Sequence, residues 1–127
     1  MKKFICILLM AIFATGCTTL ADAKRAEGEG LRRVYKTDLD SAWASIKTAL
    51  NKYKLAVATE NKSEGYFLAQ NSMSLLSYGE NVAIFVKKKT ENTTEVEIVS
   101  KKVLTTNIFA SDWSQTIHNE LSNTLAR

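Results

Sequence analysis

Ser114 and the single histidine of this 127-residue chain, His118, lie four positions apart. In a helix such a spacing makes two side chains neighbours, which a hydrolytic serine–histidine pair would require. The chain lacks both a strained Gly-x-Ser-x-Gly turn and a glycine-rich oxyanion loop. We therefore expect no enzyme and no catalytic residue. His118 follows an apolar residue, about 100° around the helix from it, and we expect it at a solvated or boundary position.

Residues that could bind a metal ion or a cofactor are equally sparse. One histidine excludes a multi-histidine metal site. Asp38 and Asp40 could contact a cation, but near a helix start they would already interact favourably with the helix dipole. The five glycines never form G-x-G-x-x-G or a P-loop. We expect no metal and no cofactor.

Cys17 is the residue whose surroundings do indicate chemistry. Two lysines at positions 2–3 precede an apolar stretch over residues 4–13, which is typical of a secretory signal. The stretch is too short to span a bilayer as a helix, because that takes roughly 20 residues. Small residues at positions 14–16 (ATG) stand directly before the cysteine.

This arrangement resembles the lipobox of bacterial lipoproteins, although Ala14 stands where many lipoboxes have Leu. The resemblance implies that residues 1–16 are a signal peptide and that Cys17 carries acyl chains after cleavage. Two or three acyl chains hold a protein firmly to a membrane. Under the sorting rule of enteric bacteria, Thr18 rather than Asp favours the outer membrane, facing the periplasm. The alternative is a plain signal peptide followed by an incidental cysteine.

Removal of residues 1–16 also changes the number of cysteines and the formal net charge of the chain. Cys6 is lost, so no intramolecular disulfide can form. The formal net charge of the whole chain is +4, but two of its 17 basic residues and none of its 13 acidic ones lie in the removed segment. A weakly positive domain without a concentrated basic face is not expected to bind nucleic acid.

Two basic runs remain in the mature chain: Lys87, Lys88 and Lys89, and then Lys101 and Lys102. If their strands form a hairpin, the first run lies beside its turn and the second near the far end of its outgoing strand. One interpretation is solvation and protection of the sheet ends. The other is contact with anionic headgroups or with an acidic envelope partner.

The rest of the chain predicts a tether and one domain. Residues 17–30 are small, charged and glycine-bearing, without apolar periodicity, so we expect a flexible tether after the cysteine. The interval 31–127 then suffices for a single domain.

The clearest periodic segment, residues 38–53 (DLDSAWASIKTALNKY), predicts a helix. One face of it is apolar, with Leu39, Ala42, Trp43, Ile46, Ala49, Leu50 and Tyr53. Asp38 or Asp40 can cap its start. We interpret Trp43 and Tyr53 as packing residues, although a ligand-stacking pair is the alternative.

Five strands are expected, one in the short run before Asp38 that holds Leu31, Val34 and Tyr35, and four over residues 54–60, 65–72, 81–89 and 94–102. The last two predict a hairpin around TENT. Val82, Ile84 and Val86 share one face of it, and Val96 and Ile98 are their expected partners. Glu95 and Glu97 alternate with those residues, which predicts a solvent-exposed opposite face.

A second helix over residues 111–125 (SDWSQTIHNELSNTL) has Trp113, Ile117, Leu121 and Leu125 on one stripe, with Ser111 as a plausible cap. The expected order is strand, helix, four strands, helix. The sequence therefore predicts an α+β domain, a curved antiparallel sheet of about five strands with two helices on one face.

Residues 31–127 resemble small bacterial lipoproteins with a TATA-box-binding-protein-like domain, a domain type that is also similar to those of a lipoprotein component of the outer-membrane β-barrel assembly machinery. The resemblance rests on DLDSAWASIKTAL, NVAIFVKKKTENTTEVEIVSKK and NIFASDWSQTIHNEL. It implies a fold and an envelope location, and it brings no catalytic residue to any position of this chain.

Two functions are expected ahead of an enzyme. The first is a lipid-anchored envelope protein that binds another envelope protein or has a structural role. The second is a lipid or small-ligand binder, which would need an enclosed pocket of about 300 Å³ or more between helix and sheet.

Overall fold

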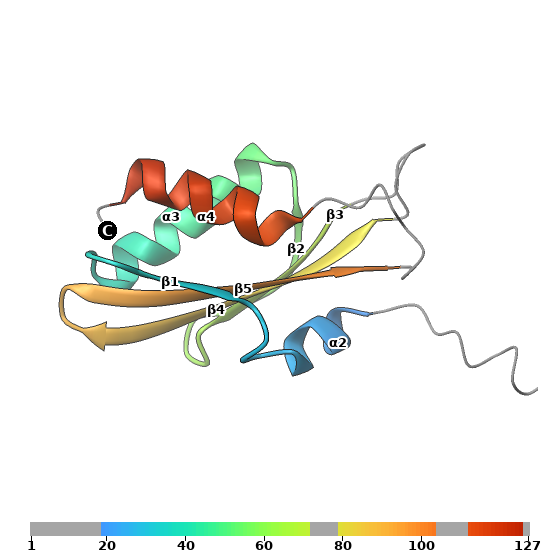
Figure 1. Cartoon of the computed structure of the whole chain (residues 1–127), viewed down its shortest axis with the longest axis horizontal. Coiled ribbons are helices and arrows are strands. Elements are labelled where there is room, and N and C mark those ends of the chain that lie inside the picture. The colour runs from blue at the N-terminus through green and yellow to red at the C-terminus, as the bar shows by residue number, and fades with distance from the viewer. Residues whose placement is uncertain (1–18, 72–78, 104–111, 126–127) are drawn as a thin grey trace, which may run out of the picture.

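The computed structural model describes residues 19–71, 79–103 and 112–125 (Figure 1). Its elements in chain order are α2 (Leu20–Arg25), β1 (Leu31–Tyr35), α3 (Leu39–Lys52), β2 (Ala56–Asn61), β3 (Tyr66–Asn71), β4 (Glu80–Thr90), β5 (Thr93–Lys102) and α4 (Trp113–Thr124).

The strands form one antiparallel sheet in the order β1-β5-β4-β3-β2. The predicted hairpin is confirmed, since Ile84 lies opposite Ile98 and Val86 opposite Val96. Strand β1 is only five residues long, and the pairing of β2 with β3 shifts register between Val57 and Thr59. Helices α3 and α4 lie together on one side of the sheet (Figure 1), so the predicted α+β class with two helices on one face is confirmed.

Helix α3 begins after Asp38, whose side chain accepts a hydrogen bond from the backbone N–H of Ser41 at 2.8 Å. That bond lowers the pKa of Asp38. The predicted apolar face is confirmed. Trp43 is 4% exposed, and its ring lies 4.1 Å from that of Phe67. The centre of the Tyr53 ring instead lies 5.8 Å from the centre of the Trp113 ring of α4. Trp43 and Tyr53 therefore pack against different aromatic partners.

Helix α4 completes this core layer. Ile117 and Leu121 are fully buried, while Trp113 and Leu125 pack against the same core. The expected cap, Ser111, lies outside the described residues. The helix is capped by Asp112, which accepts a hydrogen bond from the backbone N–H of Ser114 at 3.0 Å.

The expected tether is wrong from Thr19 onward. Thr19 and Asp22 form a capping box, in which each side chain bonds the other residue's backbone N–H. The short helix α2 that follows lies on the side of the sheet opposite α3 and α4 (Figure 1). Ala23 and Ala26 have only a methyl group, so the helix can approach the sheet closely.

The expected solvent-exposed face is therefore also wrong where α2 covers it. The α2 side of the sheet has its own apolar cluster, which consists of Ala23, Ala26, Tyr66, Leu68, Ala83, Phe85 and Val99. Glu97 is 5% exposed on this side. The domain thus has three layers at this position, α2, the sheet and the α3–α4 layer.

Candidate functional site

The predicted lipidation site, Cys17, lies outside the described residues. The first described residue, Thr19, is two positions after it and already caps α2. The part of the structure that bears on anchoring is therefore α2 and the loop 26–30 that follows it. We call this part the α2 strap, residues 19–30.

The helix of the α2 strap is held by apolar contacts. Ala23 is fully buried, and Leu20 packs against the same cluster. Lys24 places its ammonium group 4.3 Å from the centre of the Tyr66 ring, which adds a cation–π attraction. The helix is thus attached to β3 through both a methyl contact and a charged side chain.

The loop of the α2 strap is held by the buried carboxylate of Glu97. Its Oε1 accepts the backbone N–H groups of Gly28 at 2.5 Å and Gly30 at 3.1 Å, and its Oε2 accepts Arg32 Nε at 2.9 Å. The loop conformation needs glycine at both positions. Gly28 has a φ of +95°, and a Cβ on Gly30 would lie 2.6 Å from the Ile98 carbonyl oxygen. We call this arrangement the Glu97 clamp.

The two lysine runs lie apart, as expected. Lys87 is opposite Glu95 in the β4–β5 register, and Glu95 and Lys101 are separated by about 20 Å of strand. Lys88 pairs with Glu91 at 2.7 Å, Lys89 with Glu95 at 3.4 Å and Lys101 with Glu29 at 3.6 Å.

Strand alternation divides these lysines between the two sides of the sheet. Lys87 and Lys89 line a depression of about 400 Å³ together with Glu27 and Gly28 of the α2 strap. Lys101 lines another, of about 230 Å³, with Asp22 and Arg25. The structure therefore brings lysines of both runs to the α2 side, which the sequence did not suggest.

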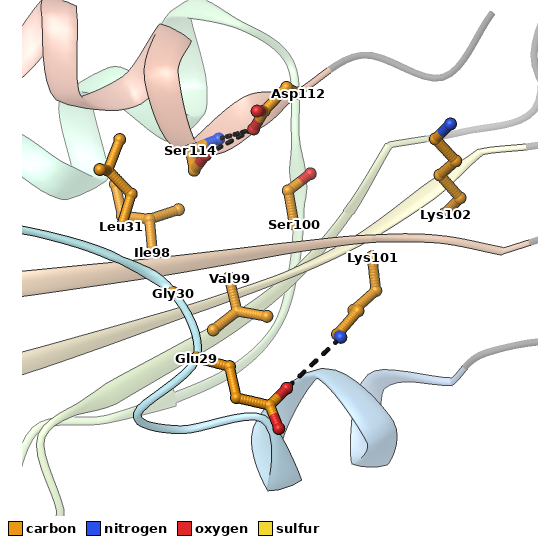
Figure 2. A pocket seen from close by; sticks show the side chains of 10 residues that line it. All are labelled: Glu29, Gly30, Leu31, Ile98, Val99, Ser100, Lys101, Lys102, Asp112 and Ser114. Atoms are coloured by element: carbon orange, nitrogen blue, oxygen red, sulfur yellow. Dashed lines mark hydrogen bonds and ion pairs between the residues drawn. The ribbon is translucent and has the colours of Figure 1, made fainter. Parts of the chain in front are cut away.

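A depression of about 270 Å³ lies beside β5. Figure 2 shows its lining side chains, between the end of the α2 strap and the start of α4. Lys101 and Glu29 form their ion pair on one side of it, and the Lys102 side chain extends from the opposite face of β5. Near its other wall, Ser114 donates its hydroxyl to Asp112 at 2.5 Å. The depression is open to solvent and its wall is largely polar. In contrast, apolar side chains fill the space between the sheet and α3 and α4.

His118 is fully buried, so its predicted boundary position is wrong. Its Nε2 lies 2.8 Å from the Leu31 carbonyl oxygen, which can only accept, so Nε2 carries the proton and donates. Its Nδ1 then accepts from the Tyr35 hydroxyl at 2.7 Å. Burial lowers the pKa of His118, against a smaller opposing effect of the Leu31 bond. Ser114 and His118 thus bond to different partners.

A second buried polar group, Glu80, was not singled out from the sequence. It is fully buried at the start of β4, where its Oε2 accepts Asn71 Nδ2 at 2.6 Å and Trp113 Nε1 at 3.3 Å. These partners lie 9 and 33 residues away in the chain, so no local sequence pattern predicts that they meet. Glu80 thereby joins β3, β4 and α4.

Asp38 and Asp40, the considered cation contacts, have separate roles. Asp38 caps α3, whereas Asp40 pairs with Lys62 at 2.7 Å. Within residues 19–71, 79–103 and 112–125, no cluster of three or more His, Cys, Asp or Glu side chains could hold a metal ion. Among the helices of these residues, none is long and apolar enough to cross a membrane.

Comparison with protein-family models finds no match for this chain, and comparison with curated proteins finds none either.

Proposed function

We propose that the chain is a lipid-anchored protein of the bacterial cell envelope, held through acylated Cys17, with its domain facing the periplasm from the outer membrane. One observation carries the proposal, the order of segments along the chain. A basic start, a short apolar stretch and the residues Ala-Thr-Gly-Cys are followed, after one further residue, by a folded domain at Thr19. That order is what a cleaved and acylated export signal would require.

We further propose that the domain acts by binding, as a non-enzymatic interaction or structural module for another envelope protein. The buried ionisable groups support this role. His118 joins α4 to β1, Glu97 holds the α2 strap and Glu80 joins α4 to the sheet. Each of these groups therefore has a structural task. The resemblance of residues 31–127 to small envelope lipoproteins agrees with the same proposal.

The experiment replaces Cys17 by serine in cells given radiolabelled palmitate. We expect the natural chain to incorporate palmitate and to fractionate with the envelope, because acyl chains contribute about 0.8 kcal/mol per buried methylene. Cys17→Ser should incorporate none and accumulate as the uncleaved precursor. Cys6→Ser is the matched control and should be labelled normally.

Continued palmitate incorporation in Cys17→Ser would contradict the anchor. Crosslinking in the same cells tests the binding role. An envelope protein crosslinked to the natural chain and lost with Cys17→Ser would support it. Lipid found in place of protein would favour the small-ligand alternative.

A further inference from the structure

We infer that the α2 side of the sheet is the side that faces the membrane, so that the lipid on Cys17 holds the domain close to the headgroups in one orientation. The inference rests on the proposed lipidation of Cys17. Its first support is chain length. Thr19 follows Cys17 by only two positions, with Thr18 between them, and two residue steps span at most about 7 Å when fully extended.

The second support is that α2 cannot swing away from the sheet without breaking buried contacts. Ala23 and Ala26 are buried at 0% and 6% exposure. The Glu97 clamp then holds the backbone of Gly28 and Gly30 directly after the helix. The strap is fixed to the sheet at its helix and at its loop. The short connection to Cys17 therefore limits how far the whole domain, and not only its first residues, can lie from the membrane.

The third support is the charge of this side. Glu29, Glu95 and Glu97 lie on it, and each is paired with a basic side chain. These three paired carboxylates would therefore repel anionic headgroups little, whereas Glu27, which lines the same depression as Lys87, is an exposed carboxylate on this side. Lys87 lines the depression beside the loop, and within the described residues no ion pair involves it. A lysine close to an anionic surface interacts favourably with it.

The experiment measures the local potential on the two sides of the domain. Ala21 of α2 and Ala44 of α3 are both exposed alanines on helices of opposite layers. Ala21→Cys and Ala44→Cys therefore form a matched pair for attachment of a pH-sensitive spin label. In the acylated chain the Cys17 sulfur is blocked and Cys6 has been removed, so the new thiol reacts alone.

The labelled, acylated proteins are placed in vesicles of phosphatidylethanolamine with phosphatidylglycerol. A surface potential of about −30 mV raises the apparent pKa of a label at the surface by about 0.5 unit. We expect this shift at position 21. At position 44 it should be largely absent, because the sheet and a helix layer intervene and the potential decays over about 10 Å. Vesicles without phosphatidylglycerol should show no shift at either position.

A linker variant provides the decisive control. A 20-residue Gly/Ser insertion between Thr18 and Thr19 adds a root-mean-square reach of about 25 Å. The shift at position 21 should then disappear although Cys17 remains acylated. Equal shifts at both positions, or a shift that survives the insertion, would overturn the inference. Mass spectrometry of the same samples separates the two proposals, since an unacylated Cys17 refutes the anchor itself and the orientation with it.

Discussion

At the scale of single residues, His118 shows how a side chain with catalytic potential acquires a structural role. Both ring nitrogens are bonded, Nε2 to the Leu31 carbonyl oxygen and Nδ1 to the Tyr35 hydroxyl. A protonated ring would have two donors, so the Tyr35 hydroxyl would accept from Nδ1 and donate to the His118 carbonyl oxygen, which lies 3.2 Å away. Burial disfavours this charged ring and lowers the pKa of His118, so the neutral form is favoured in the fold.

Stability should consequently depend on pH. The pKa of His118 is lowered in the folded state, while in the unfolded chain it is near 6.5. Between these two pKa values the unfolded chain binds the extra proton, so stability is full above about pH 6.5 and falls below it, by at most about 1.4 kcal/mol per pH unit. Urea unfolding between about pH 7.5 and pH 5.5 measures this dependence, because carboxylates titrate mainly below that window.

His118→Gln is the comparison, since the chain has no other histidine. We expect this variant to be less stable at the upper pH and nearly insensitive to pH across the window. A pH dependence equal to that of the natural chain would contradict the assignment.

At the scale of elements, the Glu97 clamp links the α2 strap to β5 of the sheet. A single buried carboxylate accepts two backbone N–H groups and one guanidinium N–H. Within the six residues of α2 itself, only Ala23 is buried. The clamp should therefore determine how firmly the strap is held.

Glu97→Ala should lower the free energy of unfolding by about 3 kcal/mol, because two part-buried backbone N–H groups lose a charged acceptor and a hydrogen bond to a charged group contributes roughly 1.5–3 kcal/mol. Hydrogen exchange should also accelerate at residues 20–30. Glu95→Ala is the matched control on the same side of β5. It removes only the pair with Lys89 and should cost less than about 1 kcal/mol. Similar exchange in both variants would show that the clamp is not what holds the strap.

At the scale of the whole molecule, the α2 strap belongs to the folded domain. Tyr66, Leu68 and Phe85 are each at most 9% exposed with the strap in place. A chain that begins at Leu31 would lack α2 and would return these side chains to water. The domain should then become less stable and acquire an exposed apolar patch.

Two soluble chains, beginning at Thr19 and at Leu31, test this expectation. We expect the shorter chain to be less stable by at least about 2 kcal/mol, the value for re-exposing one large apolar side chain. It should also bind a dye for exposed apolar surface. Equal urea midpoints and equal dye binding would mean that the strap contributes nothing to the fold.

The sequence predicted the elements that have long periodic patterns. The α3 and α4 stripes repeat over three turns or more, and the β4–β5 hairpin alternates over almost its full length, so local spacing suffices to identify them. Helix α2 is six residues long and makes its apolar contacts mainly through alanines, which leaves no periodic signal.

The candidate site depends on contacts between distant parts of the chain. Glu97 meets Gly28 and Gly30 across 69 and 67 residues, and His118 meets Tyr35 across 83. In both cases the neighbouring residues in the sequence predict a solvent-exposed side chain. The side chain is buried by an element that is distant in sequence, and the position of that element cannot be predicted from local patterns.

The shape of the two outer strands bears on whether copies of this protein can polymerise through their sheet edges when they are crowded together. Strand β1 offers only five residues, and His118 already occupies the Leu31 carbonyl oxygen. Strand β2 is interrupted by its register shift between Val57 and Thr59. Short or irregular borders make poor templates for strand addition between copies. Neighbouring molecules in a crowded layer should therefore stay separate.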